Sequence, residues 1–173
     1  MPLPKLTLVL GGASSGKSDF AESLVLEWEK SPAYIATAQA FDAEMQAKIA
    51  AHRRARGEVW RTIEAPLDLG QAFGKAGEDT VLLDCVTLWL SNHLLAESAP
   101  DPLLEGLEAL LAQRSAPTVI VSNEVGQGIV PENALARQFR ALQGRLNRRL
   151  AARADLVVQV VAGLPVVLKG QLP

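Results

Sequence analysis

The chain has 173 residues, of which 49% are hydrophobic and 21% charged, and its formal net charge at pH 7 is −2. This length predicts a single domain, residues 1–173, and the balanced charge argues against general electrostatic binding to nucleic acid or to an acidic membrane surface. The one cysteine excludes an internal disulfide, no secretory signal pattern is visible, and the apolar runs are too short for a membrane span, so we expect a cytoplasmic protein.

Short apolar runs alternate with helical patterns along the chain. Near-continuous runs of valine, isoleucine and leucine are typical of strands buried on both faces, and their alternation with helices predicts an α/β fold with a mostly parallel sheet flanked by helices. In chain order we expect strands at 6–10, 33–37, 80–84, 117–123 and 155–161, and helices at 18–30, 42–56, 67–76, 102–114 and 133–154.

Two further segments complete this outline. The final run GLPVVLKG predicts a C-terminal hairpin strand that turns back against the strand before it. The polar, proline-bearing segment 91–102 predicts a surface loop.

The run GGASSGKS follows the first strand and opens the first helix. It matches the phosphate-loop pattern G-x-x-x-x-G-K-[ST], in which backbone N–H groups cradle phosphate oxygens at a helix N-terminus. The lysine of the pattern reaches the β- and γ-phosphates of a nucleoside triphosphate, and the last serine is a ligand for Mg²⁺. The expected phosphate-binding residues are Gly11, Gly12, Ala13, Ser14, Ser15, Gly16, Lys17 and Ser18.

Two acidic residues follow later strands. Asp84 ends TVLLD, where a carboxylate is expected to support Mg²⁺, although an acid can also simply mark a strand end. Glu124 follows the next predicted strand and precedes Gly126 and Gly128. It is a candidate for orienting a substrate hydroxyl or accepting its proton, and the alternative is a glycine-rich surface turn.

The helix predicted at 133–154 has two faces. Helical spacing predicts that one face packs on the core and that the other is basic. The basic face is either a solvated surface or a contact for another subunit or an anionic ligand. The expected core residues are Leu135, Phe139, Leu142, Leu146 and Leu150, and the expected basic face comprises Arg137, Arg140, Gly144, Asn147 and Arg148.

His52 lies on the helix predicted at 42–56, on the same side as Ile49. Lys48 and Arg56 are one turn away on either side; their charges disfavour the imidazolium form and suit phosphate binding. A neutral imidazole can attack an α-phosphate and form a covalent nucleotidyl intermediate. The residues alone leave a structural histidine as the alternative.

Six blocks of the sequence, in order and over nearly the whole chain, resemble the bifunctional adenosylcobinamide kinase / adenosylcobinamide-phosphate guanylyltransferase family. They are GGASSGKS, YIATAQAFDAEMQAKIAAHR, WRTIEAP, LLDCVTLWLSN, VSNEVGQGIVPEN and RQFRALQGRLNRRLAARAD. The most specific part is the NEVG-x-GIVPEN block together with the histidine-bearing helix.

The resemblance implies a RecA-like P-loop fold, a homotrimer and two activities. One is transfer of the γ-phosphoryl group of ATP or GTP to the aminopropanol hydroxyl of adenosylcobinamide. The other is transfer of GMP from GTP, through a guanylyl-histidine, to adenosylcobinamide phosphate. The position matching the guanylylated histidine is His52, and the matched blocks add Arg53 and Glu64 to the expected nucleotide-binding residues.

The chain differs from the family pattern at two positions. Ser14 stands where arginine is frequent, which bears on nucleotide preference or on a neighbouring contact but not on the core of the motif. Ala51 stands where some members carry a second histidine. The second difference leaves His52 as the one candidate nucleophile on its helix. Two alternatives to the full enzyme are a nucleotide-binding regulatory or assembly module and a guanylyltransferase that has lost the kinase activity.

Overall fold

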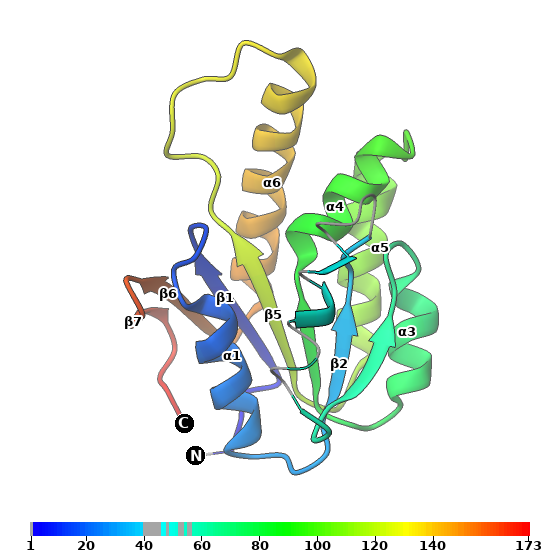
Figure 1. Ribbon diagram of the computed structural model, residues 1–173, viewed down its shortest axis with the longest axis vertical. Coiled ribbons are helices and arrows are strands. Elements are labelled where there is room, and N and C mark those ends of the chain that lie inside the picture. Colours follow the sequence, from blue (N-terminus) through cyan, green and yellow to red (C-terminus); the bar gives the residue numbers. More distant parts are fainter. Residues whose placement is uncertain (1, 40–45, 48, 52–53, 55–56) are drawn as a thin grey trace.

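The computed structural model describes residues 2–39, 46–47, 49–51, 54 and 57–173. Within these ranges, seven strands form one sheet in the order β3-β2-β4-β5-β1-β6-β7 (Figure 1). All pairings among β1 to β6 are parallel, and β7 runs antiparallel to β6, so the predicted parallel sheet and C-terminal hairpin are confirmed. The strands are β1 (Leu6–Gly11), β2 (Ala33–Ala36), β3 (Arg61–Glu64), β4 (Val81–Asp84), β5 (Thr118–Asn123), β6 (Leu156–Val161) and β7 (Leu164–Lys169).

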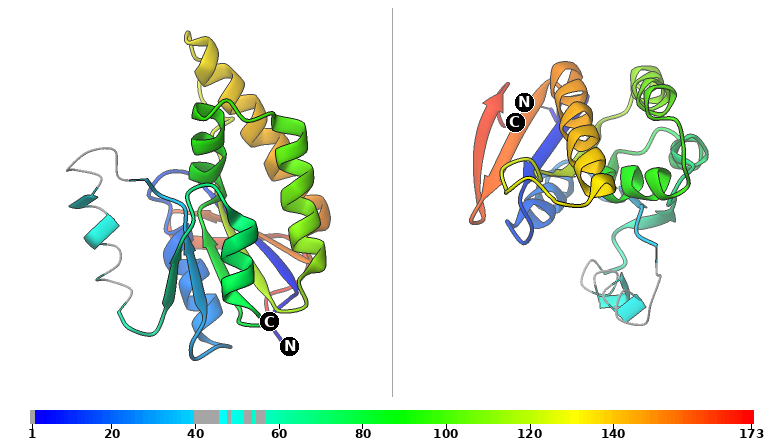
Figure 2. Two further views of the ribbon diagram at one scale, coloured as in Figure 1. Left: turned by 90° about the vertical axis from the view of Figure 1, so that its right-hand side faces the viewer. Right: turned by 90° about the horizontal axis from the view of Figure 1, so that it is seen from above.

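Helices cover both faces of the sheet (Figures 1 and 2). On one face, α1 buries Ala21, Leu24 and Val25 in a cluster with Val119 and Val121 of β5. On the other face, α3, α4, α5 and α6 share a larger cluster with alternate residues of the same strands. No helix of the described residues is long and apolar enough to cross a membrane. The bounds are α1 (Lys17–Leu26), α3 (Leu69–Ala76), α4 (Val86–Leu95), α5 (Pro100–Gln113) and α6 (Ala134–Arg153).

Adjacent strands β1 and β5 lead to opposite faces of the sheet. The chain leaves β1 into α1 on one face and leaves β5 towards α6 on the other. In open parallel sheets this change of side creates a crevice beyond the carboxyl ends of the two strands, where ligands bind. The fold therefore places the end of β1, and the glycine-rich run that follows it, at the preferred site for a ligand.

The prediction of a surface loop at 91–102 was wrong. Helix α4 continues to Leu95, and α5 begins at Pro100, leaving a short turn between them. Proline is tolerated in the first turn of a helix because the N–H it lacks has no partner there. The polar residue Asn92 is buried in α4 because its amide donates hydrogen bonds to the carbonyls of Thr37 and Pro66.

Three further features of the structure differ from what the sequence predicts. Strand β3 was not predicted; it is a four-residue edge strand paired with β2. On α6, Leu135 lies in the first turn and is 46% exposed rather than part of the core. The N-terminal part of this helix extends beyond the end of the sheet (Figure 1). Asn147, expected on the basic face, is buried.

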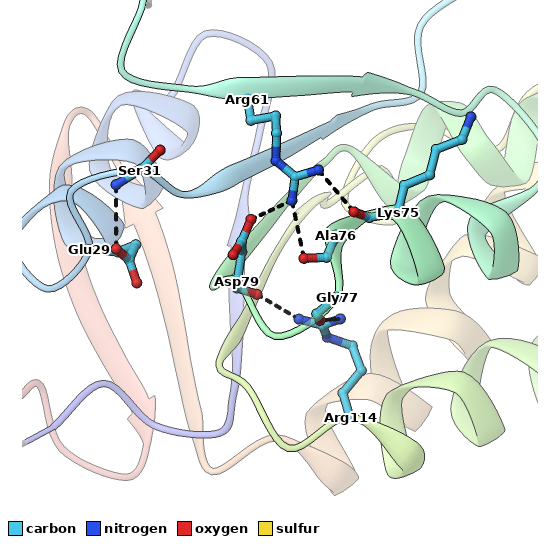
Figure 3. A network of polar contacts seen from close by, with 8 residues as sticks. All are labelled: Glu29, Ser31, Arg61, Lys75, Ala76, Gly77, Asp79 and Arg114. Carbon is cyan, nitrogen blue, oxygen red and sulfur yellow. Dashed lines mark hydrogen bonds and ion pairs between the residues drawn. The ribbon is translucent and has the colours of Figure 1, made fainter.

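Two arginines fix the turn that follows α3 (Figure 3). Arg61 of β3 donates hydrogen bonds to the carbonyls of Lys75 and Ala76 and forms an ion pair with Asp79. Arg114, which follows α5, donates to the carbonyls of Gly77 and Asp79. The turn therefore has its backbone carbonyls satisfied by side chains from an edge strand and a distant helix end.

Glu108 of α5 joins two arginines of α6. Arg149 donates to both carboxylate oxygens at 2.9 and 2.6 Å, and Arg153 lies at 3.1 Å. The hydrogen bonds from Arg149, with those from Arg153, lower the pKa of Glu108 from 4.5 to about 2. This carboxylate therefore stabilises the fold above about pH 4.5, and its contribution is lost as the pH falls towards 2.

We expect Glu108→Gln to lower the free energy of unfolding by about 1 kcal/mol at neutral pH, since both arginines are partly exposed and screened by solvent. The difference from the wild type should shrink as the pH falls from about 4.5 to 2. Urea unfolding at several pH values measures both effects. A difference that stays constant down to pH 2 would contradict the pKa assignment.

Candidate functional site

The glycine-rich run between β1 and α1 forms a phosphate loop. Gly16, with φ 87°, caps the N-terminus of α1, and Ser14 also has a positive φ of 55°. The Nζ of Lys17 donates a hydrogen bond to the carbonyl of Gly12 at 3.0 Å, so the lysine folds back over the loop. Backbone N–H groups at a helix N-terminus, with a lysine above them, form an anion site suited to phosphate.

The loop packs tightly on the structure beneath it. A Cβ on Gly11 would lie 2.3 Å from the Oγ of Ser15 and 2.9 Å from the carbonyl of Val160, so only glycine fits there. The N–H of Gly163, in the turn of the β6–β7 hairpin, donates to the carbonyl of Ser15 at 2.8 Å. The Oγ of Ser15 is buried in this packing and has no hydrogen-bond partner among the described residues.

A cavity of about 560 Å³, here called the phosphate-loop cavity, opens beside this loop. Its volume lies in the range of small-molecule sites. Its other walls come from β2, β4 and β5. The lining includes Ser14, Ser15, Gly16, Lys17, Ser18, Tyr34, Ile49, Asp84, Cys85 and Asn123. One cavity is thus lined by Lys17, the expected phosphate-binding lysine, and by Ser18 and Asp84, the expected Mg²⁺ ligands.

Asp84 is held by a neighbouring strand. The phenol of Tyr34, on β2, donates a hydrogen bond to its Oδ2 at 2.5 Å. The described residues contain no cluster of three or more histidine, cysteine or acidic side chains. Mg²⁺ needs no such cluster, because it binds through one or two protein oxygens together with substrate phosphates and water. Ser18 and Asp84 in one cavity fit that requirement.

Cys85 follows Asp84 and is buried against the same cavity. Burial, reinforced by the charge of Asp84, raises the pKa of its thiol from 9.0 to about 11. The thiol is therefore protonated at neutral pH, and only the thiolate is a good nucleophile. Cys85 is a packing residue of the site, not a candidate for covalent chemistry.

Asn123 and Glu124, at the end of β5, face different cavities. Asn123 lines the phosphate-loop cavity, which the sequence analysis missed. Glu124 lines a second cavity, along α6, and its Oε1 accepts a hydrogen bond from the N–H of Gly126 at 2.6 Å. Glu124 lies at the same edge of the sheet as Asp84, but it lines the cavity along α6. Alternate residues of a strand point to opposite faces, which explains this separation.

A buried polar network underlies the end of β5. The Oγ of Ser122 donates to the Oδ1 of Asn147 at 2.6 Å, and the amide of Gln143 donates to both of them. The amide of Asn147 also donates to the carbonyl of Asn123, whose N–H donates to Thr87 of α4. Both backbone groups of Asn123 are therefore fixed by side chains from two helices.

We expect Asn147→Ala to lower the free energy of unfolding by about 2–3 kcal/mol, because it leaves buried hydrogen-bonding groups without partners. Denaturant unfolding measures this. Arg148→Ala is the matched control, since its exposed side chain is one residue further along α6 and its loss should change stability by less than about 0.5 kcal/mol. Equal stability of Asn147→Ala and the wild type would show that the network is not a stabilising unit.

The other residues that the sequence singles out differ in where they lie. Glu64 ends β3 opposite Ala36 and is not part of the described lining of the phosphate-loop cavity. Ile49 does line that cavity. His93, the second histidine, contacts Trp89 edge-on and forms hydrogen bonds with Ser98 and with the carbonyl of Leu67. These contacts give it a structural role in α4. His52, Lys48, Arg53 and Arg56 lie outside the described residues.

A family model and two known proteins that resemble this chain all indicate the same family. Residues 7–168 match the model of the family described as "Cobinamide kinase / cobinamide phosphate guanyltransferase". The chain is 44% identical over 168 residues to the "Bifunctional adenosylcobalamin biosynthesis protein CobP" of Pseudomonas aeruginosa, covering 95% of this chain and 97% of that protein. It is 42% identical over 181 residues to the CobU protein of the same description from Salmonella typhimurium, covering 95% and 99%.

Among solved structures, an ATPase from a type III secretion system of pathogenic bacteria is similar with a TM-score of 0.56 and 9% identity. The match covers 95% of this chain and 57% of that one. At this identity the likeness shows the fold alone, and it supports the P-loop NTPase architecture expected from the sequence.

Proposed function

The chain belongs to the cobinamide kinase / cobinamide phosphate guanyltransferase family, and from this premise we propose that it carries out both reactions in cobalamin biosynthesis. It is an enzyme with kinase and guanylyltransferase activities. The single observation that best supports its chemistry is that Lys17, Ser18 and Asp84 line one cavity at the phosphate loop.

In the kinase step, the aminopropanol hydroxyl of adenosylcobinamide attacks the γ-phosphorus of ATP or GTP. A new O–P bond forms, the bond to the β-phosphate oxygen breaks, and the nucleoside diphosphate leaves. Lys17 stabilises charge on the β- and γ-phosphates, and the backbone N–H groups of the loop hold the phosphates in place. Glu124 accepts or orients the hydroxyl proton.

Ser18 and Asp84, which line the same cavity, would hold Mg²⁺, and the ion would neutralise charge on the phosphates. Tyr34 supports this arrangement because its hydrogen bond occupies one oxygen of Asp84 and limits rotation of the carboxylate.

In the transferase step, an imidazole nitrogen of His52 attacks the α-phosphorus of GTP and pyrophosphate leaves. A phosphate oxygen of adenosylcobinamide phosphate then attacks the same phosphorus, the P–N bond breaks, and adenosyl-GDP-cobinamide is released. Ile49, which helical spacing puts on the same side as His52, lines the phosphate-loop cavity, and this supports the assignment. Lys48, Arg53, Arg56 and Glu64 remain predicted nucleotide-binding residues on the family resemblance.

The homotrimer and the cytoplasmic location are part of the same proposal. Exposed apolar residues on the β6–β7 hairpin, including Leu164, Val166 and Leu168, are compatible with a subunit contact. Sedimentation equilibrium measures the number of subunits directly.

The test of the proposed function is a pair of labelling experiments on the wild-type protein. With γ-labelled ATP or GTP, label should pass to adenosylcobinamide. With α-labelled GTP, label should remain on the denatured protein and then pass to added adenosylcobinamide phosphate. Tight GTP binding with no transfer in either experiment would support a regulatory nucleotide-binding module. Transfer of α-label alone would indicate a guanylyltransferase without kinase activity.

A further inference from the structure

A second cavity lies along α6, on the face of the sheet opposite α1. Its volume is about 670 Å³, and we call it the α6 groove. Its lining includes Leu10 from β1, Glu124 and Val130 from the segment after β5, and Gly144, Arg148 and Ala151 from α6. A cavity of this size is in the range of small-molecule sites.

The α6 groove and the phosphate-loop cavity share the end of β5 as a wall. Asn123 lines the phosphate-loop cavity, and its neighbour Glu124 lines the α6 groove. The carboxyl end of β1 contributes in the same way, since Leu10 lines the groove and the phosphate loop begins one residue later. Ligands in the two cavities therefore approach the same strand ends from opposite faces.

The surface of the groove suits a broad ligand. Gly144, Ala141 and Ala151 present little or no side chain along α6, and a Cβ built on Gly144 would meet no atom within 4 Å. Small residues along one wall allow a flat or bulky molecule to approach the helix backbone. A corrin macrocycle is broad, apolar on its faces and rimmed with amide groups, so one edge of it matches such a wall.

Four arginines line the groove, and they differ in the contacts they make. Arg137 and Arg140 donate hydrogen bonds to backbone carbonyls between residues 126 and 132, and Arg145 forms an ion pair with Asp101. Arg148 is exposed and has no hydrogen bond or ion pair with the described part of the chain. Arginine binds phosphate groups well through its planar guanidinium.

We propose that the α6 groove is the acceptor site, which holds the corrinoid edge that carries the aminopropanol arm. The arm passes the end of β5 towards the phosphate-loop cavity, Glu124 contacts it, and Arg148 attracts the phosphate of the phosphorylated acceptor. This inference rests on the proposed function, because it assigns the second substrate of that reaction to a cavity. Phosphoryl transfer requires the acceptor oxygen within about 3–3.5 Å of the phosphorus, so the proposal requires the arm to reach past the end of β5.

A substitution that narrows the α6 groove without destabilising the fold tests the proposal. Gly144→Leu adds a side chain in open space, and leucine favours a helix interior over glycine, so the variant should be at least as stable as the wild type. We expect the KM for cobinamide to rise about tenfold or more. Nucleotide affinity, measured without cobinamide, should stay within about twofold of the wild type, because the phosphate loop is untouched.

Gly106→Leu is the matched control. Gly106 is an exposed helical glycine of α5 whose added Cβ also meets no atom within 4 Å, and it lies on neither cavity. An unchanged KM for cobinamide in Gly144→Leu would overturn the proposal. So would a change in subunit number in Gly144→Leu without substrate, because the groove would then hold a second copy of the chain. A wild-type protein that phosphorylates no cobinamide contradicts the proposed function instead.

Arg148 gives a second, independent readout. Arg148→Ala should raise the KM for cobinamide phosphate in the transferase step more than the KM for cobinamide in the kinase step, because only the former carries a phosphate. Arg148→Lys should restore part of the difference. Lys5→Ala, which removes a charge before β1 at the opposite edge of the sheet, is the control. Equal changes in both KM values would contradict the role assigned to Arg148.

Discussion

Replacing Lys17 with alanine is expected to reduce both activities by about 10²–10³-fold in kcat/KM, the effect typical of removing one group that stabilises transition-state charge. Lys17 opens α1 and lines the phosphate-loop cavity, with its ammonium group 3.0 Å from the carbonyl of Gly12. The kinase step needs it at the γ-phosphate, and the transferase step needs it where pyrophosphate leaves. Steady-state assays of each reaction, with nucleotide binding measured separately, check the prediction.

The control for Lys17→Ala is Lys30→Ala. Lys30 follows the end of α1 and should leave both activities within about twofold of the wild type, because it contributes neither to the loop nor to the cavity. Loss of only one activity in Lys17→Ala would mean that the two reactions use different phosphate sites, contrary to the proposal of one shared loop.

Replacing His52 with alanine is expected to abolish the label that α-labelled GTP leaves on the protein, and with it the formation of adenosyl-GDP-cobinamide. No P–N bond can form without the imidazole, so the loss should reach the detection limit of the assay. The kinase step should continue, because the attacking atom there is the acceptor hydroxyl. Acid-quenched gels and separate kinase assays give the two readouts.

The second histidine supplies the matched control. His93→Ala removes a ring that hydrogen-bonds within the fold, so its stability should fall while the label on the protein remains. Label retained on His52→Ala, or lost from His93→Ala at a temperature where that variant is folded, would contradict the assignment of His52 as the nucleophile.

The phosphate loop could be predicted because its information is local. A strand, a fixed spacing of glycine and lysine, and a helix follow one another without interruption, so the residues between 11 and 18 define the geometry by themselves. Asp84 could be predicted for a similar reason: it ends an apolar strand, and parallel strands bring their carboxyl ends to one edge.

The direction in which Glu124 faces could not be predicted in the same way. Strand alternation separates Asn123 from Glu124, but which face carries α1 and which carries α6 depends on the handedness and order of the whole sheet. Asn147 was misplaced for a related reason. Helical periodicity treats asparagine as a surface residue, whereas here Ser122 of β5 supplies a buried partner at 2.6 Å.

Helix α4 was missed because its pattern is not amphipathic. It is covered both by the sheet and by neighbouring helices, and it buries Thr87 and Asn92 as well as Val86, Trp89 and Leu90. A helix that buries polar residues together with apolar ones lacks the one-sided periodicity on which sequence prediction depends.

The hydrogen bond from Gly163 to the carbonyl of Ser15 joins the turn of the C-terminal hairpin to the phosphate loop. The turn also packs closely on the loop, because a Cβ built on Gly16 would lie 3.2 Å from the Cα of Gly163. We therefore expect phosphate binding to the loop and the stability of the hairpin turn to be linked, and such a linkage is reciprocal: each raises the other by the same factor. The stability of the β6–β7 hairpin is thus expected to influence the affinity for nucleotide, although the hairpin lies far from the phosphate loop in the sequence.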